Sequence, residues 1–125
     1  MIMDVNRITE IIIGRAIEVH RRLGPGMLEN VYKHCLAYEL KQAGLRVESE
    51  VPVPVTYKEI RLDCGYRIDL LVEDKVVVEL KTVDDFHPTN EAQILTHLRF
   101  ADKHVGLLIN FKTNMLINGI RRYRL

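Results

Sequence analysis

Asp69, Glu79 and Lys81 are charged residues inside two apolar, β-branched runs, Tyr66–Val72 and Val76–Val83. Such runs predict buried strands. Residues two apart in a strand project from the same face, so Glu79 and Lys81 would lie roughly 7 Å apart along one strand. The sequence therefore places a carboxylate beside an ammonium group in apolar surroundings.

The register between these strands decides whether a second carboxylate joins them. Glu73-Asp74-Lys75 separates the runs and is typical of a tight hairpin. With a three-residue loop, Asp69 would face Glu79 at about 5 Å between Cβ atoms, and such a pair destabilises a sheet unless a cation or a proton lies between the carboxylates. Two acidic ligands plus water suit Mg²⁺. A two-residue loop would instead oppose Asp69 to Val78, so the metal hypothesis depends on the register. The three-residue loop also predicts one apolar face made of Ile68, Leu70, Val72, Val76, Val78 and Leu80.

The same charges also have a simpler explanation. Glu79 and Lys81 can form an ion pair on one face, with Asp69 a solvated residue on the open side of the sheet. An Asp followed by Glu-x-Lys is a weak pattern when taken alone.

Three helices are predicted around these strands. Asp4–Leu23 carries apolar residues at helical spacing and ends before Gly24-Pro25-Gly26, and about Met27 to Gln42 forms a second helix that ends near Gly44. A third helix spans about Thr89 to Ala101. Two helices therefore precede the first strand.

The remaining segments predict further strands. Arg46–Tyr57 alternates but contains Pro52 and Pro54, which favours an edge strand. Val105–Phe111 is a strand, and Met115–Tyr123 is a last strand-like segment. The element order is ααβββαββ, without a repeat or a linker. We expect an α/β fold and one domain over residues 1–125.

Composition limits the classes of function. Lys and Arg number 18 against 17 Asp and Glu, so a site for a polyanion must be local, with Arg67 and the run Arg121–Arg124 as candidate phosphate contacts. Cys35 and Cys64 lack metal-ligand spacing and are interpreted as small buried hydrophobic residues, which suits the cytoplasm. The start Met1–Asp4 resembles no export leader, and we expect no membrane span.

A resemblance connects these pieces. Gly26-Met27-Leu28-Glu29-Asn30-Val31-Tyr32 matches the Gly-x-x-Glu-x-x-Tyr signature of the GxxExxY family, and it precedes Asp69, Glu79-Leu80-Lys81 and Gln93 in that family's order. The resemblance implies the PD-(D/E)xK nuclease superfamily, which includes restriction endonucleases and archaeal Holliday junction resolvases. It implies a restriction-endonuclease-like αβββαβ core, here with an extra N-terminal helix and a C-terminal strand.

The resemblance also implies roles for individual residues. Asp69, Glu79, Glu29 and the backbone carbonyl of Leu80 would bind Mg²⁺, for which Mn²⁺ can substitute, and Lys81 would orient or deprotonate the attacking water. Metal and cation together are what phosphodiester hydrolysis needs. Glu29 has an equally good structural explanation as an acid favoured by the dipole at a helix N-terminus.

Gln93 and His97 are four residues apart and share one face of the third helix. Related nucleases carry Gln-x-x-x-Tyr here, so Gln93 is a candidate site residue, while the role of His97 in the tyrosine position stays open. Gln93 also fits a capping box formed by Asn90–Gln93. Tyr32 is expected to be a core aromatic residue with a partner for its hydroxyl, or a support for Glu29.

Three hypotheses follow. The first is a metal-dependent nuclease acting on DNA, with RNA and a homodimer left open. The second is an inactive nuclease-fold module that binds nucleic acid or a protein partner. The third is an interaction domain that dimerises through edge strands such as Arg46–Tyr57, with incidental charges.

Overall fold

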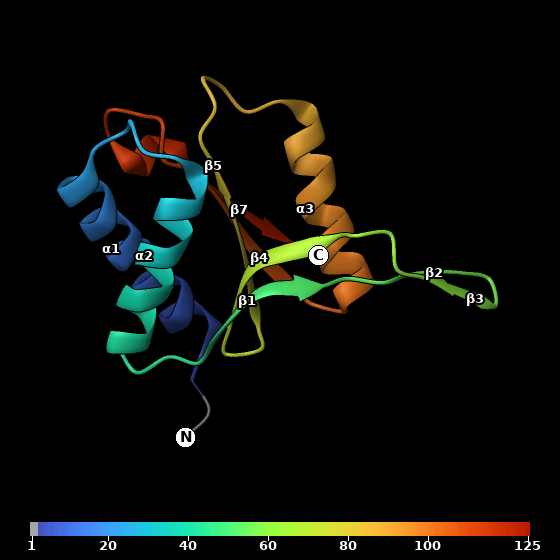
Figure 1. Ribbon diagram of the computed structural model, residues 1–125. Helices are drawn as coiled ribbons and strands as arrows, with labels where there is room; N and C mark the ends of the chain where they lie inside the picture. Colours follow the sequence, from blue (N-terminus) through green and yellow to red (C-terminus); the bar gives the residue numbers. More distant parts are fainter. Residues whose placement is uncertain (1–2) are drawn as a thin grey trace.

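The computed structural model describes residues 3–125 and shows helices on both faces of a central sheet (Figure 1). Met1 and Ile2, on which the expectation of no leader partly depended, lie outside the described residues. The elements are α1 (Val5–Leu23), α2 (Glu29–Gln42), β1 (Val47–Pro52), β2 (Val55–Tyr57), β3 (Ile60–Leu62), β4 (Arg67–Val72), β5 (Val76–Lys81), α3 (Pro88–Ala101), β6 (Val105–Asn110), the 3₁₀ helix η1 (Leu116–Gly119) and β7 (Ile120–Arg124).

Within residues 3–125 the main sheet has five strands in the order β1-β4-β5-β6-β7. Strands β5 and β6 are parallel, and the other neighbours are antiparallel. Helix α3 provides the crossover that a parallel pair requires. The series α2-β1-β4-β5-α3-β6 is the predicted αβββαβ core, with α1 before it and β7 after it. The predicted fold is confirmed.

Two apolar layers hold the sheet between the helices. Helix α1 turns Ile8, Ile12, Ala16 and Val19 toward α2 and one face of the sheet, and it begins at Asp4, whose side chain accepts the Asn6 N–H at 3.0 Å. The second layer lies between α3 and the other face. Coverage of both faces explains why β5 and β6 are almost continuously apolar. In residues 3–125, no helix is both long and apolar enough to cross a bilayer.

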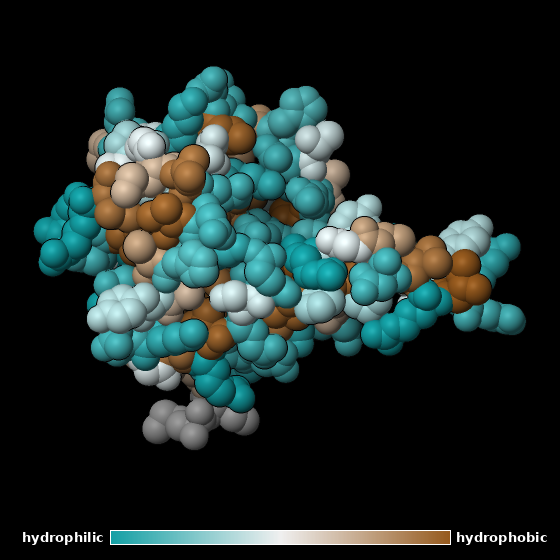
Figure 2. All heavy atoms as spheres, in the orientation of Figure 1, coloured by the Kyte–Doolittle hydropathy of each residue, from teal (hydrophilic) through white to brown (hydrophobic). Residues whose placement is uncertain are grey.

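The predicted edge strand Arg46–Tyr57 is wrong in its second half. Strand β1 ends at Pro52, and β2 instead pairs with β3, which the sequence pattern did not predict, in a separate two-stranded ribbon. Pro54 supplies no N–H with which to continue the ladder. The ribbon projects from the body of the protein (Figure 1). It carries exposed apolar side chains, with Tyr57 at 59% and Ile60 at 53% exposure, and Figure 2 shows apolar colour along it.

The predicted strand Met115–Tyr123 is also wrong at its start, where η1 precedes β7. The chain passes close to itself here, because a Cβ on Gly119 would lie 2.4 Å from the Asn110 carbonyl oxygen. Only glycine fits at that distance. Cys64 was predicted to be buried and is exposed, since it lies just after β3, whereas Cys35 is half-buried, and both thiols are free.

The apolar face predicted for the hairpin holds except at Ile68. Leu70 packs with α1 and α2, whereas Ile68 packs in the layer beneath α3. Across from this point, Glu50 has φ 54°, between the pairs Ser49–Leu70 and Val51–Ile68. The regular alternation of the strand is lost at this distortion.

Candidate active site

Asp69 and Glu79 meet where strands β4 and β5 separate. The pairs Val72–Val76 and Leu70–Val78 confirm the three-residue loop. Beyond Leu70, the Asp69 N–H donates to Glu79 Oε2 at 3.1 Å, and the Leu80 N–H donates to Asp69 Oδ2 at 2.8 Å. Each carboxylate therefore takes a backbone N–H of the opposite strand. Side chains replace the main-chain ladder at this position and open the sheet.

Burial and like charge act on the carboxylates at this opening. Burial is the largest cause that raises the pKa of Glu79. A hydrogen bond with His97 opposes this rise, and the negative charge of Asp69 adds to the rise. Glu29 is the first residue of α2, where partial burial and then the Asp69 charge raise its pKa. Lys81 and Lys33 oppose that rise. Asp69 is thus the link between the two glutamates.

Glu29 and Asp69 border a hollow of about 200 Å³ that is also lined by Asn30, Lys33 and Glu50. Lys33 contacts Glu50 across this hollow. Neither residue was recognised in the sequence. For Lys33 a signal existed, because it lies four residues after Glu29 and so shares a helical face with it.

Glu50 adopts the left-handed backbone region, with φ 54°, opposite Asp69 in the register of β1 and β4. Such a conformation is unfavourable for a residue with a Cβ and often occurs at functional sites. A glutamate in an alternating strand gives no sequence signal of it, so this residue could not have been found from the pattern.

Lys81 is half-buried, and its Nζ lies 3.5 Å from Gln93 Oε1. The proposed capping box at Asn90–Gln93 is wrong, because the helix begins earlier. His87 caps α3 and forms the capping box with Asn90, while Gln93 lies in the second turn. The free side chain of Gln93 can therefore reach the ammonium group of Lys81.

His97 is buried, and its Nδ1 is hydrogen-bonded to Glu79 Oε1. Four residues along a helix span about 6 Å and two residues along a strand about 6.6 Å. The spacing of Gln93 and His97 on α3 thus matches that of Lys81 and Glu79 on β5. Gln93 contacts Lys81, and His97 contacts Glu79. Helix α3 therefore brings Gln93 and His97 onto the two charged residues of the strand.

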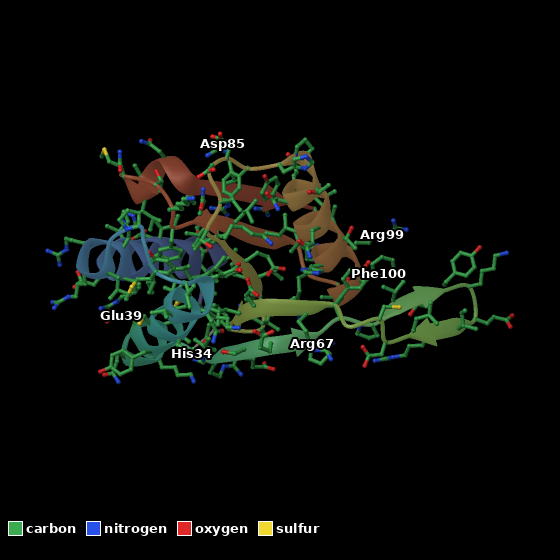
Figure 3. All side chains as sticks on the ribbon, turned by 45° about the horizontal axis from the view of Figure 1, so that its top comes forward. His34, Glu39, Arg67, Asp85, Arg99 and Phe100 are labelled. Atoms are coloured by element: carbon green, nitrogen blue, oxygen red, sulfur yellow. The ribbon has the colours of Figure 1, made fainter. Side chains whose placement is uncertain are left out.

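Arg67, a predicted phosphate contact, begins β4 two residues before Asp69, where the ribbon joins the sheet (Figure 3). Its guanidinium lies 3.5 Å from an Asp63 carboxylate oxygen. A cation is therefore available beside the opening, although it is partly neutralised.

The donor atoms fit a hard divalent cation in type and charge. Asp69, Glu79 and Glu29 offer carboxylate oxygens, and burial together with the charge of Asp69 raises the pKa values of both glutamates. Among residues 3–125, no three His, Cys, Asp or Glu side chains converge closely enough to hold a metal. The Glu79 carboxylate is hydrogen-bonded to His97. Leu80 lies between Glu79 and Lys81, its N–H on Asp69.

The mixed α/β fold, with an acidic pair at a strand opening and a lysine two residues on, is that of a restriction-endonuclease-like protein. A family model described as the PD-(D/E)XK nuclease superfamily matches residues 6–123, and the chain belongs to this superfamily. Membership indicates a nuclease that acts on nucleic acid, and nucleases of this superfamily typically use divalent metal ions. Comparisons with curated proteins and with solved structures gave no significant match.

Proposed function

We propose that this protein is a metal-dependent nuclease that hydrolyses DNA phosphodiester bonds with Mg²⁺, for which Mn²⁺ can substitute. The observation that carries the proposal is the pairing of two carboxylates at the strand opening, where Glu79 accepts the Asp69 N–H and Asp69 accepts the Leu80 N–H, with Lys81 two residues after Glu79. The Gly26, Glu29 and Tyr32 spacing further supports a place in the GxxExxY family.

Asp69, Glu79, Glu29 and the Leu80 carbonyl would hold the ion. When bound, a divalent cation polarises the phosphate and lowers the pKa of a coordinated water. The charge of Asp69 raises the pKa of both glutamates, which supports Asp69 as the ligand between them.

Lys81 has the position of a group that acts on the phosphate or on the attacking water. Its ammonium group projects from the same strand as Glu79, and Gln93 Oε1 lies at hydrogen-bonding distance. A preorganised cation stabilises charge that develops on a phosphate, and an amine within reach of the attacking water can orient it. Gln93 orients this side chain without itself bearing charge.

The alternative is a non-catalytic nuclease-fold module that binds nucleic acid or a protein partner. One observation favours it: no three His, Cys, Asp or Glu side chains converge into a ligand cluster in the described part of the chain. In that case Lys81 would contribute to binding rather than to turnover.

Cleavage of plasmid, linear, single-stranded and junction DNA, and of RNA, in Mg²⁺, Mn²⁺ or EDTA tests the proposal. Lys81→Ala should abolish a metal-dependent activity and leave the fold intact. Lys103→Ala is the matched control, because Lys103, between α3 and β6, pairs at 3.1 Å with Asp74 in the β4–β5 loop, away from Asp69. Normal cleavage by Lys81→Ala would contradict the mechanism. Binding of DNA without cleavage, unchanged by Lys81→Ala, would support the non-catalytic module.

A further inference from the structure

We propose that His97 is a positioning residue, which holds Glu79 in one orientation and so fixes how this carboxylate faces a divalent cation. The inference deepens the proposed function and rests on its metal site. It assigns a role to the residue that departs from the Gln-x-x-x-Tyr pattern.

Both oxygens of Glu79 are held by this chain. Oε1 is bonded to His97 Nδ1, and Oε2 accepts the Asp69 N–H at 3.1 Å. Glu79 and His97 are 5% and 2% exposed, so water competes little for these bonds. Each carboxylate oxygen has two acceptor positions, and one on each oxygen remains for a further ligand. The two donors thus fix the carboxylate plane without exhausting its capacity.

Packing holds His97 itself in place. Its helix neighbours Ile94 and Leu98 are fully buried beneath the sheet, and the Tyr66 ring meets the imidazole edge-on at 5.9 Å between centroids. The imidazole therefore offers Nδ1 from a fixed position, and Glu79 can turn away only by losing this hydrogen bond.

Of the two ring nitrogens of His97, only Nδ1 has a partner in the described part of the chain. Nε2 is buried and has no hydrogen-bond partner among residues 3–125. An unsatisfied buried polar atom costs about 1–3 kcal/mol, whereas an apolar side chain of similar size would fill the same space without that cost. The bond from Nδ1 to Glu79 is what the histidine contributes.

The test measures Mn²⁺ affinity by titration calorimetry, and the melting temperature without metal, for the wild type, His97→Leu and His97→Asn. Loss of a group that orients a metal ligand typically weakens metal affinity by about 10–100-fold, and we expect this for His97→Leu. Asparagine can place an amide N–H near the position of Nδ1. The Mn²⁺ affinity of His97→Asn should therefore stay within about threefold of the wild type, well short of the weakening expected for His97→Leu.

His20→Leu is the matched control. His20 is also a buried histidine bonded through one ring nitrogen, with Nε2 2.7 Å from the Thr113 carbonyl oxygen. It should lower the melting temperature but leave Mn²⁺ affinity unchanged.

Several outcomes would overturn the role. One is a His97→Leu variant that binds Mn²⁺ as tightly as the wild type, and another is a wild type that binds no Mn²⁺. The role would also fail if His97→Asn or His20→Leu lost as much Mn²⁺ affinity as His97→Leu. A wild type whose Mn²⁺ affinity depends on His97 in the expected way, but that cuts no nucleic acid, would refute the catalytic proposal and leave the positioning role standing.

Discussion

Asp69 and Glu79 each accept a backbone N–H of the opposite strand, from Leu80 at 2.8 Å and from Asp69 at 3.1 Å respectively. The two acids therefore belong to the structure of the sheet as well as to its chemistry. Removal of either side chain would leave a strand N–H without its acceptor, so alanine variants mix the loss of a ligand with the loss of a structural bond. Isosteric amides separate these effects.

Asp69→Asn should separate charge from structure. Its carbonyl oxygen can still accept the Leu80 N–H, while repulsion of Glu79 is removed. Like charges facing each other across a strand pair destabilise by about 0.2–1 kcal/mol, so we expect the free energy of unfolding in EDTA to rise by this amount. Urea denaturation measures it, and Mn²⁺ affinity should fall in parallel. A variant that is clearly less stable than the wild type would contradict this explanation.

Metal affinity should depend on pH through the carboxyl groups. The pKa values of Glu29 and Glu79 are raised above 4.5, so protons compete with a cation for these oxygens at pH values where ordinary carboxyls are already ionised. Mn²⁺ affinity should therefore fall as the pH is lowered toward the raised pKa values, and binding should release protons. Calorimetry in buffers of different ionisation enthalpy measures this release.

The stability of the metal-free protein should fall as the pH rises, whereas its affinity for Mn²⁺ rises. In the window between 4.5 and the raised pKa values, the folded state holds more protons than the unfolded state, so these two groups lower the free energy of unfolding as the pH rises. Affinity that is independent of pH, together with no proton release, would exclude these glutamates as ligands.

The backbone at Glu50 should be strained. Its φ of 54° disfavours any residue with a Cβ, by roughly 1–2 kcal/mol. Glu50→Gly and Glu50→Ala both remove the contact with Lys33, so their difference isolates the backbone. We expect the glycine variant to be more stable than the alanine variant by about 1 kcal/mol in urea denaturation. Equal stability would show that the conformation costs little.

Tyr32→Phe should loosen the segment before Glu29. The Tyr32 hydroxyl donates to the Gly24 carbonyl and accepts the Met27 N–H at 3.0 Å, while its ring stacks on Phe111 at 4.4 Å between centroids. Phenylalanine keeps the stacking and loses both bonds, at a cost of about 1–3 kcal/mol for the unsatisfied groups.

Tyr32→Phe should lower both the free energy of unfolding and the Mn²⁺ affinity, because Gly24–Met27 leads into α2, which begins at Glu29. Urea denaturation and Mn²⁺ titration measure the two effects. Reduced stability with unchanged affinity would limit Tyr32 to a role in the core.

Local patterns predicted most of the fold. Apolar spacing found the three helices, and the loop Glu73–Lys75 set the register that opposes Asp69 to Glu79. The β2–β3 ribbon was missed because its residues alternate like any strand, and nothing local shows that Val55 pairs with Leu62 instead of with the main sheet. That choice depends on the tertiary positions of the strand ends.

The site was predictable where chemistry follows strand or helix spacing. Lys81 and Gln93, both predicted site residues, lie 3.5 Å apart at their polar atoms, although the sequence did not predict this contact. The contact between His97 and Glu79 depends on how α3 is oriented over β5, and the left-handed backbone of Glu50 depends on the strand that faces it. Neither property is contained in the periodicity of one segment.

The ribbon also has a practical consequence. A hydrogen bond of 2.9 Å from the Val53 N–H to the Tyr66 carbonyl closes its base, so residues 54–65 leave and rejoin the sheet at nearly the same point. The segment carries the exposed thiol of Cys64, whereas Cys35 is half-buried between the helices. A fluorophore attached at Cys64 would therefore sit five residues from Asp69 on a projection outside the core, and its emission could report the arrival of nucleic acid in real time.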